Sequence, residues 1–250
     1  MGGKLESGAD GVNARSPASG RTFSFRRHPH TPLVRPTLRL IFSLPLVLGA
    51  CRAPGGAEAP SPLAAPVRPL AALEAQQVIV APLNRLREVD ALGWTQQIPR
   101  SREFMRAFDT ALEAELGARG LKSRWVYPEA LVRAARSNPS HAVDPYTIAA
   151  APLRNSQLMA GTRLGDPLAM QLRTMIALQE SSRGVLIPVE LWFERTPEGQ
   201  GVAVLRLALV DGRVSDVRWI GDVRSDPATR FSVEILTNLA AHSADLITAR

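Results

Sequence analysis

Cysteine is nearly absent from the chain, whose 250 residues include only Cys51. One cysteine excludes an intrachain disulfide, a metal site built on a cysteine pair, and a thiol nucleophile other than Cys51. Histidine is also scarce: the part of the chain after Cys51 contains only His141 and His242. A histidine-rich metal site is therefore excluded, and any catalytic triad would have to use one of these two. The chain also lacks a Gly-x-Ser-x-Gly elbow and a glycine-rich phosphate loop after its first strand. We predict no catalytic residues, no metal and no cofactor.

Two sets of polar residues still resemble catalytic groups. Ser140, His141 and Asp144 are close in sequence on a loop, where neighbouring side chains rarely reach nucleophile–base geometry. Glu190 and Glu194 are an even number of residues apart on one expected strand, so their carboxylates share a face. Paired carboxylates could do acid–base work, but nothing indicates a cleft around them. We interpret the first set as exposed loop residues and the second as a solvated strand face.

Aromatic residues make up only 5% of the chain, so each one is informative. Trp125, Phe193 and Trp219 fall on expected strands and are predicted to lie in the core, because each can bury a large apolar area. Trp192 shares a face with Glu190 and Glu194, so we expect it to be partly exposed and to be a candidate for a partner contact.

The basic charge is concentrated near the start of the chain. The formal net charge is +7, of which residues 1–50 supply +5 through seven basic and two acidic residues. The remainder therefore carries +2, and its arginines alternate with Asp and Glu instead of clustering. This distribution does not support a surface that follows a phosphate backbone, and we predict no nucleic-acid partner.

An export segment precedes Cys51. Arg35 and Arg39 are followed by a run of about nine mostly apolar residues, which is too short for a bilayer crossing of about 20 residues and typical of a signal peptide. The run ends in Leu48, Gly49, Ala50 and Cys51, which resemble the lipobox of bacterial lipoproteins. The resemblance implies cleavage before Cys51 and a diacylglyceryl group on its sulfur. The alternative is a short buried helix with a core cysteine.

The chain divides into four parts at this level. Residues 1–33 are an untranslated or disordered extension, because a signal peptide normally begins near the start of a chain. Val34 would be the initiator if its codon is GTG. Residues 34–50 form the lipoprotein signal peptide. Residues 51–75 form a tether rich in proline and alanine, and residues 76–250 form a globular α+β domain.

Hydrophobic periodicity predicts the elements of the domain. β-Branched and alternating runs predict strands over 77–83, 121–127, 185–195, 202–211 and 217–223. Apolar stripes at helical spacing predict four helices, which start at Ser101 as an N-cap, at Pro128, after Asp166–Pro167 and at Asp226–Pro227. Residues 137–165 are interpreted as an insertion. The order β-α-β-α-α-β-β-β-α predicts a single mixed sheet covered by helices.

One group of motifs resembles a known family. Asp211 ends one strand, and Trp219 and Gly221 lie in the next. The pattern over residues 76–247 is similar to the small envelope domain of penicillin-binding-protein activator lipoproteins and of the curli secretion channel. The turn of that family has a Thr–Gly pair, whereas the turn at 212–216 is longer. Residues 137–165 cannot supply the long membrane-spanning hairpins of the channel, so no pore is predicted.

The function predicted from these observations is that of a non-enzymatic, membrane-anchored envelope lipoprotein. It would bind an envelope protein partner or act as an assembly or accessory factor. In a host with two membranes, Arg52 after the lipidated cysteine resembles the sorting pattern for the outer membrane, facing the periplasm. The alternatives are a hydrolase with an unfamiliar site and a small-molecule-binding lipoprotein. The second is disfavoured, because a single domain of about 170 residues lacks the two lobes that would enclose a ligand between them.

Overall fold

The computed structural model describes residues 68–179 and 182–248. The segment 1–33, the signal peptide 34–50, and the lipobox Leu48, Gly49 and Ala50 with Cys51 lie outside the described residues, as does most of the tether. In the described part, no helix has the length and apolar character that a bilayer crossing requires.

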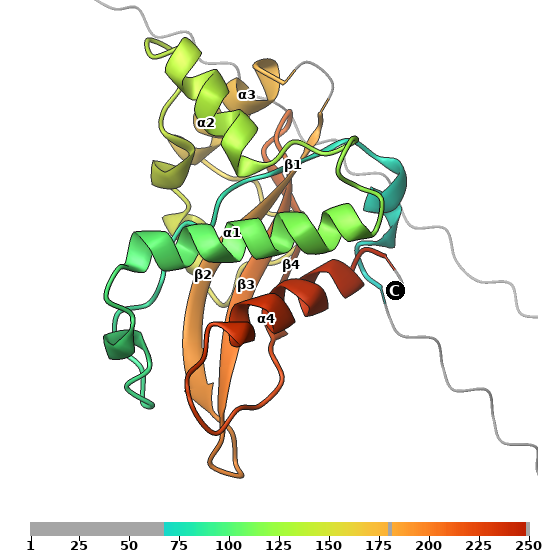
Figure 1. Cartoon of the computed structure of the whole chain (residues 1–250). Helices are drawn as coiled ribbons and strands as arrows, with labels where there is room; N and C mark the ends of the chain where they lie inside the picture. Colours follow the sequence, from blue (N-terminus) through green and yellow to red (C-terminus); the bar gives the residue numbers. More distant parts are fainter. Residues whose placement is uncertain (1–67, 180–181, 249–250) are drawn as a thin grey trace, which may run out of the picture. The chain divides into compact units, whose positions relative to one another are not determined.

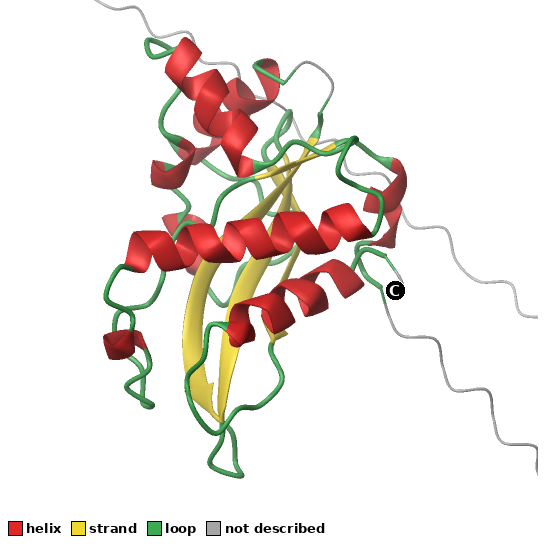
Figure 2. Ribbon diagram, in the orientation of Figure 1, coloured by secondary structure: helices red, strands yellow, loops and turns green. Residues whose placement is uncertain are grey.

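The centre of the described part is a mixed four-stranded sheet (Figures 1 and 2). Its order is β1-β2-β3-β4, with β1 parallel to β2 and the other neighbours antiparallel. The strands β2 and β3 are almost entirely buried, as their near-continuous apolar sequences require of strands covered on both faces. The predicted mixed sheet is confirmed. The strands span Val78–Val80 (β1), Gly184–Arg195 (β2), Gly201–Asp211 (β3) and Asp216–Arg224 (β4).

Helices α1 (Ser101–Ala118) and α4 (Glu234–Asp245) cover one face of the sheet (Figure 1). The apolar stripe of α1 at i+4 spacing is buried against that face, as predicted. Arg119 joins the two helices, because it contacts Glu115 at 2.6 Å and Asp245 at 2.7 Å. The buried residues of the α1 stripe are Phe104, Phe108, Leu112 and Leu116.

The opposite face is partly covered by α2 (Pro128–Ser137), α3 (Leu168–Ala177) and the segment between them. Residues 137–165, which were interpreted as an insertion, supply Ile148, Leu153 and Leu164 to a second core. That core also contains Ile187 of β2. The segment is therefore part of the fold, and it includes two short 3₁₀ helices, Pro145–Thr147 and Ala151–Arg154.

The prediction of a strand over 121–127 is wrong. The amides of Arg124 and Trp125 both donate to the carbonyl of Leu121, which closes a turn. Only Val126 pairs in a sheet-like manner, through a single bridge to Ile79. A short apolar run can bury its side chains from a turn as well as from a strand, and its periodicity does not separate the two.

Three predicted boundaries also differ. Leu70 and Leu73, assigned to the tether, are buried in the core between the sheet and helices α1 and α4, which we call the first core, and the Leu70 amide donates to the carbonyl of Leu246. Ser101 does not cap α1, because the N-cap position is Arg100 and no side chain caps the helix. Helix α4 starts at Glu234 and not at the predicted Asp226–Pro227.

Trp219 is only half-buried, which corrects the prediction of a fully buried core residue. Its indole packs at the margin of the first core and over Gly221, where an added Cβ would lie 2.6 Å from the Trp219 ring. The reason is its position on β4, the last strand in the sheet order, beside a register shift opposite Leu209 and Val210. Arg218 is exposed, as predicted.

Candidate functional site

The residues that resembled a triad make only local contacts. Ser140, His141 and Asp144 are exposed. The Asp144 carboxylate accepts the amide of Tyr146 at 3.1 Å and so caps a 3₁₀ helix. His242 is half-buried on α4, with Nδ1 2.6 Å from the carbonyl oxygen of Arg224. These contacts give Asp144 and His242 structural roles.

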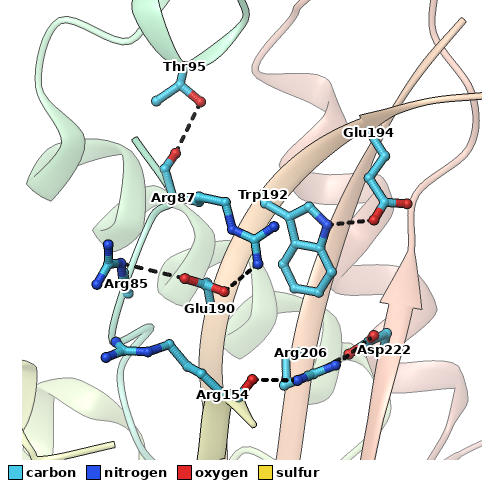
Figure 3. Close-up of polar contacts among 9 residues, drawn as sticks. All are labelled: Arg85, Arg87, Thr95, Arg154, Glu190, Trp192, Glu194, Arg206 and Asp222. Carbon is cyan, nitrogen blue, oxygen red and sulfur yellow. Dashed lines mark hydrogen bonds and ion pairs between the residues drawn. The ribbon is translucent and has the colours of Figure 1, made fainter. Parts of the chain in front are cut away.

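A β-bulge in β2 builds a different site. The register shifts between Pro188 and Glu190, which leaves Val189 as an extra residue in the strand. Proline lacks an amide hydrogen and is found in strands mainly at such bulges. The bulge places Glu190 and Trp192 on the sheet face opposite α1 and α4. There they meet Arg85, Arg87 and Arg206 (Figure 3), and we call these five residues the arginine–tryptophan platform.

Glu190 is the anionic centre of the platform. Its side chain is 9% exposed, accepts a hydrogen bond from Arg87 Nη2 at 2.6 Å and forms an ion pair with Arg85 Nε at 3.5 Å. The prediction of a solvated strand face is therefore wrong for Glu190. Both arginines lie on the segment after β1, which runs beside β2 through the bridge from Leu86 to Leu191. A buried carboxylate needs such partners, because leaving it unpaired is costly.

Trp192 lies between two guanidinium groups. Arg87 is 4.5 Å and Arg206 6.0 Å from the indole centroid, both within cation–π range. The indole Nε1 donates to Glu194 at 2.7 Å, which confirms that the two residues share a face. Trp192 is 6% exposed, so the prediction of partial exposure is wrong. With Val202 and Val204 it forms a small apolar cluster whose buried members come from the strands alone.

Arg206 ties the platform to β4 and to the neighbouring 3₁₀ helix. Its guanidinium donates to both carboxylate oxygens of Asp222, at 2.8 and 3.1 Å, and to the carbonyl of Arg154 at 2.8 Å. The hydrogen bonds that Arg206 donates to Asp222 raise the pKa of Arg206 above its ordinary value. Such two-pronged contacts fix the guanidinium plane beside the Trp192 ring.

The carboxylates at the platform are paired, whereas two of its arginines keep exposed surface. The Glu190 carboxylate is occupied by two guanidinium groups, and Glu194 is occupied by Trp192 and by Arg224 at 2.8 Å. By contrast, the side chains of Arg85 and Arg87 remain nearly half exposed. In the described residues there is no group of three or more His, Cys, Asp or Glu placed to hold a metal ion.

A buried carboxylate lies elsewhere, beside a cavity of about 660 Å³ between α1 and α2. Asp109 of α1 accepts the amide of Leu83 at 2.8 Å and the hydroxyl of Tyr146 at 3.1 Å. Burial raises the pKa of Asp109 to about 6. Burial and the neighbouring Asp109 raise the pKa of Tyr146 to about 12. Sequence reasoning missed Asp109, because its position beside the apolar stripe of α1 gave no sign of its partners.

The Asp109→Asn variant is expected to flatten the pH dependence of stability. Between about pH 4 and 6 the folded chain holds a proton that the unfolded chain, with an ordinary pKa of 3.8, has released. Stability therefore falls as the pH rises through this window, by up to about 3 kcal/mol at 1.36 kcal/mol per pKa unit. Denaturant unfolding at several pH values measures it. Asp144→Asn, at an exposed carboxylate, is the control, and an unchanged slope in Asp109→Asn would contradict the assignment.

Comparison with known proteins gives only distant solved structures. No family model and no curated protein matches the chain. LpoB from Escherichia coli is 14% identical with a TM-score of 0.32, covering 86% of this chain and 96% of that one. A PelC dodecamer from Paraburkholderia phytofirmans is 13% identical with a TM-score of 0.30, covering 68% and 87%. A lipoprotein from Neisseria meningitidis is 15% identical with a TM-score of 0.32, covering 68% and 96%. All three identities are below 25%, and all three TM-scores are below 0.5.

Proposed function

We propose that the chain is a non-enzymatic lipoprotein of the bacterial cell envelope, held to the membrane by a lipid on Cys51. It acts as a protein-binding or accessory factor. The observation that carries this proposal is the lipobox at residues 48–51, which follows an apolar run directly and contains the only cysteine of the chain. Arg52 supports an outer-membrane location, facing the periplasm, in a host with two membranes.

The arginine–tryptophan platform is the surface that we assign to the protein partner. Arginine and tryptophan are the residue types most enriched among interface hot spots. Arg85 and Arg87 keep free surface on a sheet face where the apolar cluster under them is built from strands alone. A partner that offers carboxylates to these arginines would meet charges that Glu190 and the buried Trp192 ring already hold in place. Such complementary charge gives a protein contact its specificity.

The partner contact is tested by photo-crosslinking in the full chain expressed in its host. The photoreactive side chain replaces Asn155, which is exposed and lines a hollow together with Arg206 and Asp222. We expect one envelope protein to crosslink, and Arg87→Gln to lower the yield about tenfold or more, as loss of a hot-spot side chain costs 2 kcal/mol or more.

The matched control is Arg133→Gln, which removes an exposed arginine that pairs with Glu129 on α2. This variant should leave the crosslink unchanged. Melting curves of both variants separate loss of binding from loss of folding. An equal crosslink yield in Arg87→Gln and the parent chain, with both folded, would contradict the assignment of the platform.

Small-molecule binding is a second candidate function, favoured by the cavity between α1 and α2. Its volume of about 660 Å³ lies in the range of ligand pockets, and Asp109 and Tyr146 supply polar groups at its wall. A small molecule that copurifies with the chain and is lost in Asp109→Asn would favour this function over the first.

A further inference from the structure

A second basic site lies where the described chain begins. A cleft of about 380 Å³ is lined by residues of the first turn, of the start of β2 and of the β3–β4 hairpin. We call it the N-terminal cleft. Its lining includes Pro69, Leu73, Arg183, Asp211, Arg218 and Trp219.

Asp211 organises two arginines in this cleft. Its side chain is 5% exposed, and Oδ2 accepts Arg183 Nε at 2.6 Å and Arg218 Nη2 at 2.8 Å. Oδ1 accepts the amide of Arg213 at 3.2 Å. Burial acts to raise the pKa of Asp211, but hydrogen bonds from Arg218 and Arg183 hold it below the ordinary value. The carboxylate therefore stays ionised, and the three side chains carry a net charge of +1.

The two guanidinium groups keep donors for a ligand. Arg183 uses only Nε toward Asp211, and Arg218 uses only one terminal nitrogen. Within the described residues, the other nitrogens of these groups make no hydrogen bond. The side chains are 60% and 50% exposed, respectively. Guanidinium groups bind phosphate oxygens in a two-pronged manner, so this pair is suited to a phosphate group.

Trp219 adds an aromatic ring to the same cleft. Trp94, Trp125 and Trp192 are buried, so Trp219 is the one tryptophan of the described residues that keeps some exposed surface. Tryptophan is enriched at the headgroup level of membranes, because its ring is amphipathic. Two arginines with free donors beside a half-buried indole are the combination that a phospholipid headgroup would contact.

The position of the cleft in the chain selects the source of the phosphate. Pro69 lines the cleft, and Cys51 precedes it by 18 residues, which span at most about 65 Å when fully extended. A lipid on Cys51 would therefore keep Pro69 within about 65 Å of the bilayer. Under such tethering even a weak headgroup contact is populated, because the second binding event becomes intramolecular.

We propose that the N-terminal cleft binds the phosphate of an anionic phospholipid headgroup through Arg183 and Arg218, with Trp219 beside it. The inference rests on the proposed function, because the lipid on Cys51 supplies the proximity. It assigns the domain a second contact with the membrane, in addition to the lipid anchor. Each arginine near an anionic surface contributes about fivefold to association.

Fluorescence quenching of Trp219 tests the proposal on the full, lipidated chain. The chain is reconstituted into phosphatidylcholine vesicles with or without phosphatidylglycerol, together with a lipid that carries a nitroxide on its headgroup. The quenching lost in Trp219→Phe reports this ring alone. We expect several-fold stronger quenching with phosphatidylglycerol, and about fivefold weaker association for Arg183→Gln and for Arg218→Gln. Added salt should weaken the contact.

Arg133→Gln on α2 is the control and should quench like the parent chain. Equal quenching in the two vesicle types, or no effect of either cleft variant, would overturn the proposal. If millimolar inorganic phosphate at constant ionic strength abolished the quenching of Trp219, the cleft would be assigned to free phosphate and the lipid assignment would be overturned. If the chain is lipidated but Trp219 quenching does not depend on phosphatidylglycerol, only the assignment of the N-terminal cleft is contradicted. An unmodified Cys51 in a chain that still responds to phosphatidylglycerol contradicts the proposed function alone.

Discussion

Phe193→Ala is expected to lower the free energy of unfolding by about 3–5 kcal/mol, as large-to-small changes of buried aromatics do. Phe193 is 3% exposed on β2 and faces α1 and α4. Its ring centroid is 5.5 Å from Trp94, 6.4 Å from Phe104 and 5.9 Å from Phe231, in edge-on or tilted arrangements. Removing the ring leaves a cavity beside three other aromatic rings and deletes three ring contacts, each worth about 0.5–1.5 kcal/mol beyond burial.

Denaturant unfolding, followed by circular dichroism, measures this change. Val89→Ala is the control, because Val89 is 77% exposed and its truncation should change stability by less than about 0.5 kcal/mol. A loss below about 1 kcal/mol in Phe193→Ala would contradict the claim that the packing of these aromatic rings stabilises the first core. The size of the expected loss is a large share of the stability of a typical domain.

The long strands of the fold could be predicted because their pattern is redundant. The segments 184–195 and 201–211 each hold many apolar residues and are separated by a turn with Pro197 and Gly199, so small errors at the ends did not change the assignment. The helices α1 and α3 were predictable for the same reason. The segment 121–127 contains only one short apolar run, which fits a strand or a turn equally well. In the folded chain the carbonyl of Leu121 accepts the amides of Arg124 and Trp125, so the segment forms a turn.

The platform could be predicted only in part. Even spacing correctly placed Glu190, Trp192 and Glu194 on one face. The burial of Glu190 and Trp192 involves Arg87, which is 103 residues away from Glu190 in sequence and is brought there by the bridge between its segment and β2. Neither this long-range contact nor the bulge at Val189 leaves a local signal in the sequence. The charge of Arg87 looked the same in sequence as that of any surface arginine.

The burial of Trp219 shows a limit of alternation. Period two assigns a side chain to a face, but it does not say whether that face is covered at the particular position. Trp219 lies on the face of the first core, yet β4 is last in the sheet order and the ring stays half-buried. We therefore expect Trp219 to contribute less to stability than Phe193, and its exposed edge is the part that the N-terminal cleft uses.

The Cys51→Ser variant tests the central claim most directly, because no other residue of the chain can form the thioether to a diacylglyceryl group. The measurement is labelling of the full chain with a radioactive or clickable fatty acid in its host, followed by electrophoresis and separation of membranes. The parent chain should carry label, sediment with the membranes and migrate as the form cleaved before Cys51. Cys51→Ser should lose all label and accumulate as the uncleaved precursor. Label that persists in Cys51→Ser, or a parent chain that takes up none, would contradict the account.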